Sequence, residues 1–224
     1  MRSTEFLTEG LNHPIICVDV QPSYSGMYDG DESPVFLEIM QFVQKQTGPV
    51  LFFVNAETTG VADDTVQGIQ QYWDDSLGDP GDESWDENDE YHYTEPSSPI
   101  DWRRFTMVDK GYGYLRAWMD NNVPHNIIIQ TIREMYKQKV TDTRDLEFSG
   151  NIQERTPMQS QIMRVAAELG DDNMTIGWTS VAQLKRFNGA YLVGGGREEC
   201  LKEVELLMNA FNIRYKRVDS LVYG

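Results

Sequence analysis

Cys200 lies where the sequence predicts the start of a helix. A short apolar run, Tyr191-Leu192-Val193, breaks into the three glycines Gly194 to Gly196, and a helical pattern opens at Cys200. Glycines let the backbone turn sharply, and the first N–H groups of a helix favour negative charge. A thiol in this position has a physical reason to be ionised, so Cys200 is a candidate nucleophile.

A simpler interpretation of Cys200 stays open. Cysteine is among the most buried residue types, and a cysteine in the first turn of a helix that packs on a sheet is often a small core side chain. The acidic residues Glu198 and Glu199 precede it, and nearby negative charge raises the pKa of a thiol. The pattern alone does not decide between a nucleophile and a core residue.

Two further ionisable residues follow predicted strands. The run from Ile15 to Gln21 is nearly all apolar, which is typical of a strand buried on both faces of a parallel sheet, and it contains Asp19. Lys110 closes a predicted strand that begins at Arg103. Open α/β sheets bind ligands at the carboxyl ends of their strands, so both are candidates for a site. The alternatives are a turn carboxylate before Pro22 and a surface lysine.

The elements that must position these residues alternate as in an α/β fold. Apolar runs predict strands, and residues recurring every three or four positions predict helices. We expect strands at 15–21, 50–54, 103–110 and 191–193, with one or two more in 213–223. Helices are expected at 34–47, about 63–73, 114–123, in two parts of 125–169, from Thr179 and from Cys200.

Length and charge limit the classes of function. The 224 residues can form a single domain, 1–224, with a substantial core. The net charge of -17 argues against nucleic acid and membrane surfaces as partners, because both are polyanions. It favours a small-molecule site, a basic protein partner or simply high solubility.

Cysteine content and hydropathy indicate a cytoplasmic protein. The chain has two cysteines, Cys17 and Cys200, which form neither a disulfide framework nor a zinc-binding spacing. No segment approaches 18 uninterrupted apolar residues, and the N-terminus has no pattern of an export signal.

Two segments do not fit a minimal α/β pattern. Residues 74–99 are dense in acids, and no lysine or arginine occurs between Gln46 and Trp102, which favours a solvated acidic surface loop. Calcium is a weaker alternative, because the acids lack the ligand spacing of an EF-hand. Residues 125–169 are mainly helical in pattern, and the spacing from Lys110 to Gly194 is much longer than one crossover helix requires.

Four stretches resemble the isochorismatase-like cysteine hydrolases. IICVDVQPSY is similar to the first strand of that family, with its Asp-x-Gln pattern at Asp19-Val20-Gln21. GGGREEC resembles its glycine turn before a cysteine, and KEVELLMNAFNIRYKRV resembles its last helix and strand. FTMVDKGYGYLRAWM is a looser match to its lysine-bearing segment. The resemblance covers about residues 12–56, 100–120 and 175–220, and it requires a helical insertion over about residues 120–170.

The resemblance implies a three-layer α/β/α fold with a mainly parallel sheet and a catalytic triad. Asp19 would take the thiol proton, Lys110 would hold the pair, and Cys200 would attack the carbon of a small amide-like substrate. The residues implied for oxyanion or substrate binding are Gln21, Tyr24, Gly195 and Gly196. Metal-using nicotinamidase relatives carry a histidine-rich segment after the second strand, and NAETTGVADD has no histidine, so no metal or other cofactor is expected.

Departures from the family pattern support two other hypotheses. Arg197-Glu198-Glu199 replaces the threonine and apolar residues that usually precede the cysteine, which suits a catalytically inactive scaffold for protein interaction or assembly. A magnesium-dependent phosphoesterase could instead use Asp19 with the acids Asp29, Asp31, Asp63 or Asp64. The sequence leaves the oligomeric state open, a homo-oligomer included.

Overall fold

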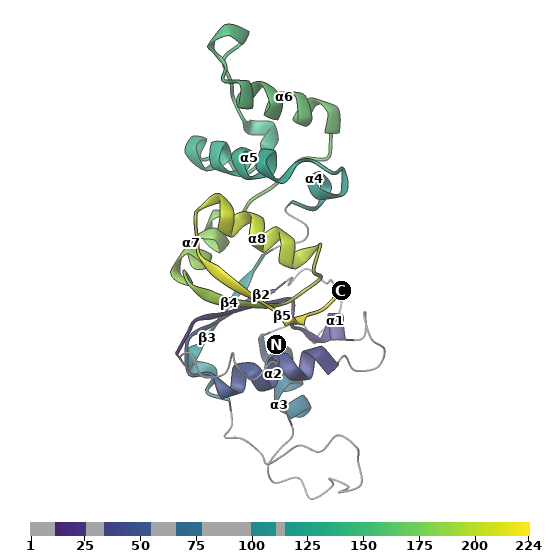
Figure 1. Ribbon diagram of the computed structural model, residues 1–224, viewed down its shortest axis with the longest axis vertical. Helices are drawn as coiled ribbons and strands as arrows, with labels where there is room; N and C mark the ends of the chain where they lie inside the picture. Colours follow the sequence, from purple (N-terminus) through teal and green to yellow (C-terminus); the bar gives the residue numbers. More distant parts are fainter. Residues whose placement is uncertain (1–11, 26–33, 55–65, 78–99, 111–114) are drawn as a thin grey trace, which may run out of the picture.

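A five-stranded, all-parallel sheet forms the centre of the computed structural model, which describes residues 12–25, 34–54, 66–77, 100–110 and 115–224 (Figure 1). The strand order is β3-β2-β1-β4-β5. The bounds are β1 Ile15–Val18, β2 Val50–Val54, β3 Phe105–Asp109, β4 Ala190–Gly194 and β5 Tyr215–Val222. The α/β class expected from the sequence is thereby confirmed.

Helices cover both faces of this sheet. In Figure 1, α2 and α3 lie on one face, and α7 and α8 lie on the other. The helices are α1 Pro22–Ser25, α2 Pro34–Lys45, α3 Val66–Leu77, α4 Arg116–Asp120, α5 His125–Gln138, α6 Pro157–Leu169, α7 Trp178–Arg186 and α8 Cys200–Ala210. Short 3-10 turns occur at Trp102–Arg104, Thr143–Asp145 and Ile152–Glu154. Among the described residues, no helix is both long enough and apolar enough to cross a membrane.

The central strands are buried on both faces because their side chains alternate between two cores. Ile16 and Val18 of β1 point into the core that contains α5, α7 and α8. Ile15 and Cys17 point into the core against α2 and α3. A near-continuous apolar run, rather than strict alternation of polar and apolar residues, is therefore what this strand needs.

The sheet changes its winding direction between β1 and β4. From β1 the chain passes through α2 to β2 and through α3 to β3, all on one side of β1. It then returns across the sheet to β4, which pairs with β1 in parallel, and passes through α8 to β5. A crevice outside the carboxyl ends of β1 and β4 is the usual ligand position in such a sheet.

Helices α4, α5 and α6 occupy the segment between β3 and α7. They lie beyond α8 as seen from the sheet (Figure 1). The Nε of Arg133 on α5 donates a hydrogen bond of 2.8 Å to the carbonyl of Ala210 at the end of α8. A capping box fixes the start of α6, where Thr156 and Gln159 bond each other's backbone N–H groups.

Some expected boundaries were wrong. The strand expected to begin at Arg103 starts at Phe105, because Asp101 accepts the N–H of Arg103 and stabilises a 3-10 turn there. Residues 74–77, placed in the acidic loop, belong to α3, and 78–99 lie outside the described residues. Residues 22–25 form the short helix α1, where no helix was expected, and 26–33 lie outside the described residues. Where one or two strands were expected in 213–223, there is one strand, β5. Its pairing with β4 shifts in register between Leu192 and Gly194.

Candidate active site

Asp19 follows β1 directly and adopts a left-handed backbone conformation, with φ of 51°. Its N–H donates to the carbonyl of Phe53 at 3.0 Å, and its own carbonyl accepts the hydroxyl of Tyr223 at 2.7 Å and the N–H of Gln21 at 3.0 Å. A positive φ is uncommon for a residue other than glycine and is concentrated at functional sites. Three hydrogen bonds thus hold the backbone of Asp19 in an unusual conformation.

Lys110 follows β3 and reaches across β2 to Asp19. Its Nζ lies 2.5 Å from Oδ2 of Asp19, and the two residues are 2% and 1% exposed. The backbone N–H of Lys110 donates to the carbonyl of Val54 at 2.8 Å, which continues the sheet past the end of β3. Two charges buried this deeply cost several kcal/mol each to desolvate, so each requires the other.

Electrostatics favour the charged form of Lys110. Burial lowers the pKa of Lys110, but the negative charge of Asp19, and those of Cys200 and Glu203 when they are ionised, more than offset this effect. The net result is a pKa above the ordinary value for lysine. Lys110 is therefore a permanent positive charge at this edge of the sheet.

The turn after β4 brings Cys200 to the same edge. Gly194 has φ of 94°, and a Cβ there would collide with the carbonyl of Val18 in β1. Only glycine allows β4 to lie this close to β1 while the chain turns. The next N–H, that of Gly195, donates to the carbonyl of Val18 at 2.7 Å, and α8 starts at Cys200.

Cys200 lies near the ion pair, and both Asp19 and Lys110 act on the pKa of its thiol. Burial, then the negative charge of Asp19, raise the pKa of Cys200 to about 12, although Lys110 acts to lower it. The expectation that the helix start would ionise this thiol is therefore wrong for the resting state. Desolvation and a neighbouring carboxylate outweigh the helix dipole, and the thiol stays protonated at neutral pH.

Glu203 adds a second buried carboxylate, one turn along α8 from Cys200. Its Oε1 accepts the backbone N–H of Leu115 at 2.9 Å, and it is 3% exposed. Burial raises the pKa of Glu203, while Lys110 acts in the opposite direction. Sequence reasoning missed this residue. An acid among the apolar positions of α8 was the available signal, because a buried acid needs a partner.

An outer ion pair connects the turn before α8 to α4. Nη2 of Arg116 lies 2.9 Å from Oε1 of Glu199, and Arg116 also bonds Asp120 one turn later. The hydrogen bond to Glu199 is the main cause of a raised Arg116 pKa. Glu199, which departs from the family pattern and directly precedes Cys200, thus has a structural partner in Arg116.

The four residues implied for oxyanion or substrate binding differ in their burial and in their hydrogen bonds. Gln21 is fully buried, and its carbonyl accepts the N–H of Tyr24, which is half-buried in α1. Gly195 and Gly196 are buried in the turn before Cys200. The N–H of Gly195 is already bonded to Val18, so we do not assign it to an oxyanion. The carbonyl of Gly196 accepts the N–H groups of Glu199 and Leu201.

Four of the acids proposed for the alternative magnesium site are not among the residues that the structure describes. Asp29, Asp31, Asp63 and Asp64 all lie outside the described residues. Within the part of the chain that is described, no three histidine, cysteine or acidic side chains gather as they would to hold a metal ion.

Comparisons with family models, with curated proteins and with solved structures find no match to this chain. A five-stranded parallel sheet between helices occurs in many unrelated proteins, so the fold does not fix the function. Function is therefore inferred from the side chains at the carboxyl edge of the sheet.

Proposed function

We propose that this protein is an isochorismatase-like cysteine hydrolase that acts on a small amide-like substrate through Asp19, Lys110 and Cys200. The observation that carries the proposal is a buried Asp19–Lys110 ion pair beside a thiol whose pKa both residues influence. Asp19 follows β1, Lys110 follows β3 and Cys200 begins the helix after β4, near the switch point between β1 and β4 where α/β sheets bind ligands. A nucleophile, a base and a residue that orients the base are what acyl transfer needs.

In the acylation step, the thiol attacks as it loses its proton. Sγ of Cys200 forms a bond to the substrate carbon while Asp19 takes the proton. The C–N bond then breaks, and the amine leaves with that proton, so Asp19 is ionised again. The amide of Cys200 is at the start of α8, where helix geometry leaves N–H groups without an intrahelical acceptor, and it can donate to the developing oxyanion.

In the deacylation step, water completes the reaction. Asp19 takes a proton from water as the water oxygen attacks the thioester carbon. The C–S bond breaks, the acid is released, and the proton returns to Cys200. Lys110 keeps its own proton throughout and holds Asp19 in place, because its ammonium stabilises the ionised carboxylate.

A non-catalytic scaffold is the second candidate. The raised pKa of Cys200 and the ion pair between Glu199 and Arg116 favour it, because both suit a turn that is structural. In that case the Asp19–Lys110 pair would only join β1 to β3.

An activated ester separates these two candidates. p-Nitrophenyl acetate reports attack by Cys200 as a burst of nitrophenolate, and mass spectrometry locates the acetyl group. We expect a burst of one equivalent on Cys200, followed by turnover. Asp19→Asn should keep the burst, because removing the negative charge makes the thiol easier to ionise. Its steady-state rate should fall by about 100-fold, since no base activates water.

Two controls make the result decisive. Cys200→Ser should lose the burst, and Cys17→Ser should keep it, because Cys17 is fully buried in the opposite core. If Cys200 is acylated no faster than free glutathione, or if Asp19→Asn turns over at the native rate, the hydrolase proposal is wrong and the scaffold is favoured.

A further inference from the structure

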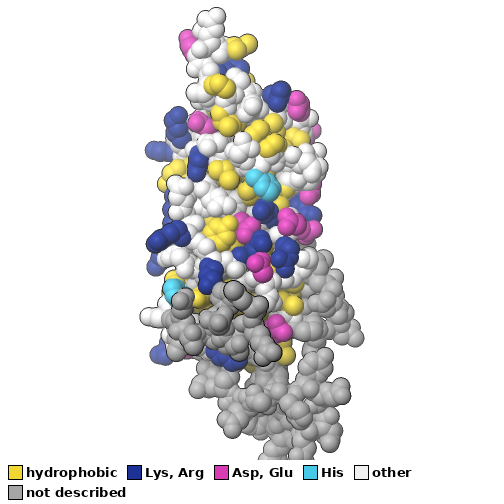
Figure 2. Space-filling view, viewed as in Figure 1, with side chains coloured by type: hydrophobic (Ala, Val, Ile, Leu, Met, Phe, Trp, Pro, Cys, Tyr) yellow, Lys and Arg dark blue, Asp and Glu magenta, His cyan; other side chains and the backbone are white. Residues whose placement is uncertain are grey.

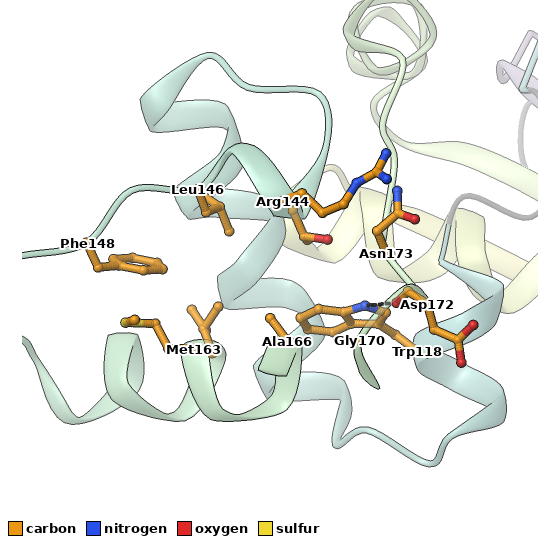
Figure 3. Close-up of a pocket in the computed structure, with 11 residues that line it drawn as sticks. Trp118, Arg144, Leu146, Phe148, Met163, Ala166, Gly170, Asp172 and Asn173 are labelled. Carbon is orange, nitrogen blue, oxygen red and sulfur yellow. Dashed lines mark hydrogen bonds between the residues drawn. The ribbon is translucent and has the colours of Figure 1, made fainter. Parts of the chain in front are cut away.

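The helical segment between β3 and α7 contains a cavity of about 230 Å³ that is separate from Cys200. Figure 3 shows Phe148 and Met163 facing each other at one end, and Arg144 and Asn173 at the other. Trp118 of α4 also lines the cavity. In Figure 1, α8 lies between this segment and the sheet.

Hydrogen bonds hold the polar end of this cavity open. Asp142 accepts the backbone N–H, Nε and Nη2 of Arg144, the last at 2.6 Å, and also accepts Nδ2 of Asn173 at 2.8 Å. The indole Nε1 of Trp118 donates to the carbonyl of Asp172 at 3.0 Å, as drawn in Figure 3. Since each of these side chains is already fixed, the walls cannot close inward without losing hydrogen bonds.

The shape and lining of the cavity restrict the ligand. Drug-sized sites measure about 300–1,000 Å³, so this cavity suits a molecule of about one ring. Aromatic and sulfur-containing walls, from Trp118, Phe148 and Met163, favour a flat aromatic body.

The polar end restricts the ligand's charge. Within the described residues, Nη1 of Arg144 has no hydrogen-bond acceptor and Oδ1 of Asn173 has no donor. Arg144 is already paired with Asp142, and Asp145 and Asp171 also act on it, so an anion gains little there.

We propose that this cavity binds a small aromatic molecule that is not an anion and that carries one group able to donate and accept a hydrogen bond, such as a hydroxyl. The ring lies between Phe148, Met163 and Trp118. The polar group accepts from Nη1 of Arg144 and donates to Oδ1 of Asn173. The proposal does not depend on the hydrolase activity.

Benzyl alcohol is the probe for this site. The full chain, with its methionine methyl groups labelled with ¹³C, is titrated and followed by NMR. The Met163 resonance, identified with Met163→Leu, should shift saturably with a Kd of about 1 mM, as expected for a fragment of this size. Met40, buried in the core on the opposite face of the sheet, should not shift. An unmoved or non-saturating Met163 resonance overturns the proposal.

Two neighbouring alanines give a matched pair of variants. Ala166 lines the cavity, whereas Ala167 on the same helix is exposed. Ala166→Phe should weaken binding at least 10-fold, and Ala167→Phe should leave it unchanged. Equal binding by the two variants overturns the site. If Ala166→Phe does not fold, the Met163 shift in the native chain decides.

A charged analogue tests the ligand class. Benzoate should bind at least 5-fold more weakly than benzyl alcohol, and Arg144→Met should weaken benzyl alcohol binding by about the same factor. Equal affinities for benzoate and benzyl alcohol would overturn the exclusion of an anion.

Discussion

Lys110 is the only cation in direct contact with Asp19 among the described ion pairs, and it also compensates the charge of Glu203. Nearly all of its side chain is inaccessible to water. If the positive charge of Lys110 is removed, solvent therefore cannot stabilise the Asp19 carboxylate in its place. Consequences for stability and for reactivity follow, and they can be measured separately.

The first prediction concerns stability. Lys110→Met should destabilise the fold by about 3–5 kcal/mol, because it leaves the Asp19 carboxylate buried without a partner. Asp19→Asn combined with Lys110→Met should recover part of this loss, since neither charge then remains. Denaturation in guanidinium checks both variants. Equal stability of Lys110→Met and the native chain would show that water reaches the site.

The second prediction concerns reactivity. Asp19→Asn should speed alkylation of Cys200 by iodoacetamide at pH 8 by at least about 10-fold, because the carboxylate raises the thiol pKa and Lys110 remains to lower it. Glu203→Gln should act in the same direction with a smaller effect. Peptide mapping of labelled Cys200 over time measures the rates. An unchanged rate in Asp19→Asn would mean that this carboxylate does not act on the thiol.

At the scale of elements, the close approach of β4 to β1 positions the turn that carries Cys200. Gly194 and Gly189 both have positive φ, at 94° and 87°. A Cβ on Gly194 would meet the backbone of β1, whereas a Cβ on Gly189 would meet nothing within 4 Å. Any other residue would be strained at either position, and the two positions differ in the space available for a Cβ.

The third prediction uses this pair. Gly194→Ala should cost at least about 2 kcal/mol more stability than Gly189→Ala, because a collision adds to the strain of a positive φ. Thermal or guanidinium denaturation compares them. Gly194→Ala should also slow acylation of Cys200, and Gly189→Ala should not. Equal losses in the two variants would show that β4 can move away from β1.

At the scale of the whole molecule, the net charge is distributed unevenly along the chain. Residues 1–11, 26–33, 55–65 and 78–99 contain 16 of the 36 acids but only one base, Arg2. The described residues therefore hold 20 acids against 18 bases and are almost neutral. Figure 2 shows acidic and basic side chains interspersed over the described surface that faces the viewer. The charge of -17 is a property of those segments more than of the α/β core.

The fourth prediction is a loss of stability in alkali. Burial raises the pKa of Cys17 far above its ordinary value near 9. Below pH 9 both the folded and unfolded states keep this proton; above it, only the folded state does, so stability falls as pH rises. The slope is at most about 1.4 kcal/mol per pH unit for each such thiol.

Replacing Cys17 isolates its contribution to the pH dependence of stability, because Lys110 and Tyr215 also bind protons more tightly in the folded state. Between pH 9 and 10.5, Cys17→Ala should lose stability less steeply than the native chain. Guanidinium midpoints at several pH values give the two slopes. Parallel slopes would show that Cys17 ionises in the folded protein.

The sequence by itself determined the order of elements and the strand ends that carry Asp19, Lys110 and Cys200. Apolar runs and helical periodicity are local properties, and they fixed α2, β2 and α8 almost to the residue. A parallel order then requires that strand ends share one edge. The juxtaposition of the three side chains was therefore predictable without coordinates.

Only the tertiary structure decided the protonation of Cys200, the role of Glu203 and the cavity beside Trp118. Each depends on desolvation and on contacts between residues far apart in the chain, such as Glu203 with Leu115 and Arg144 with Asn173 through Asp142. A sequence pattern reports which residues are near a helix start, but not how much water the fold removes from them. That removal, together with Asp19, outweighs the helix dipole at Cys200.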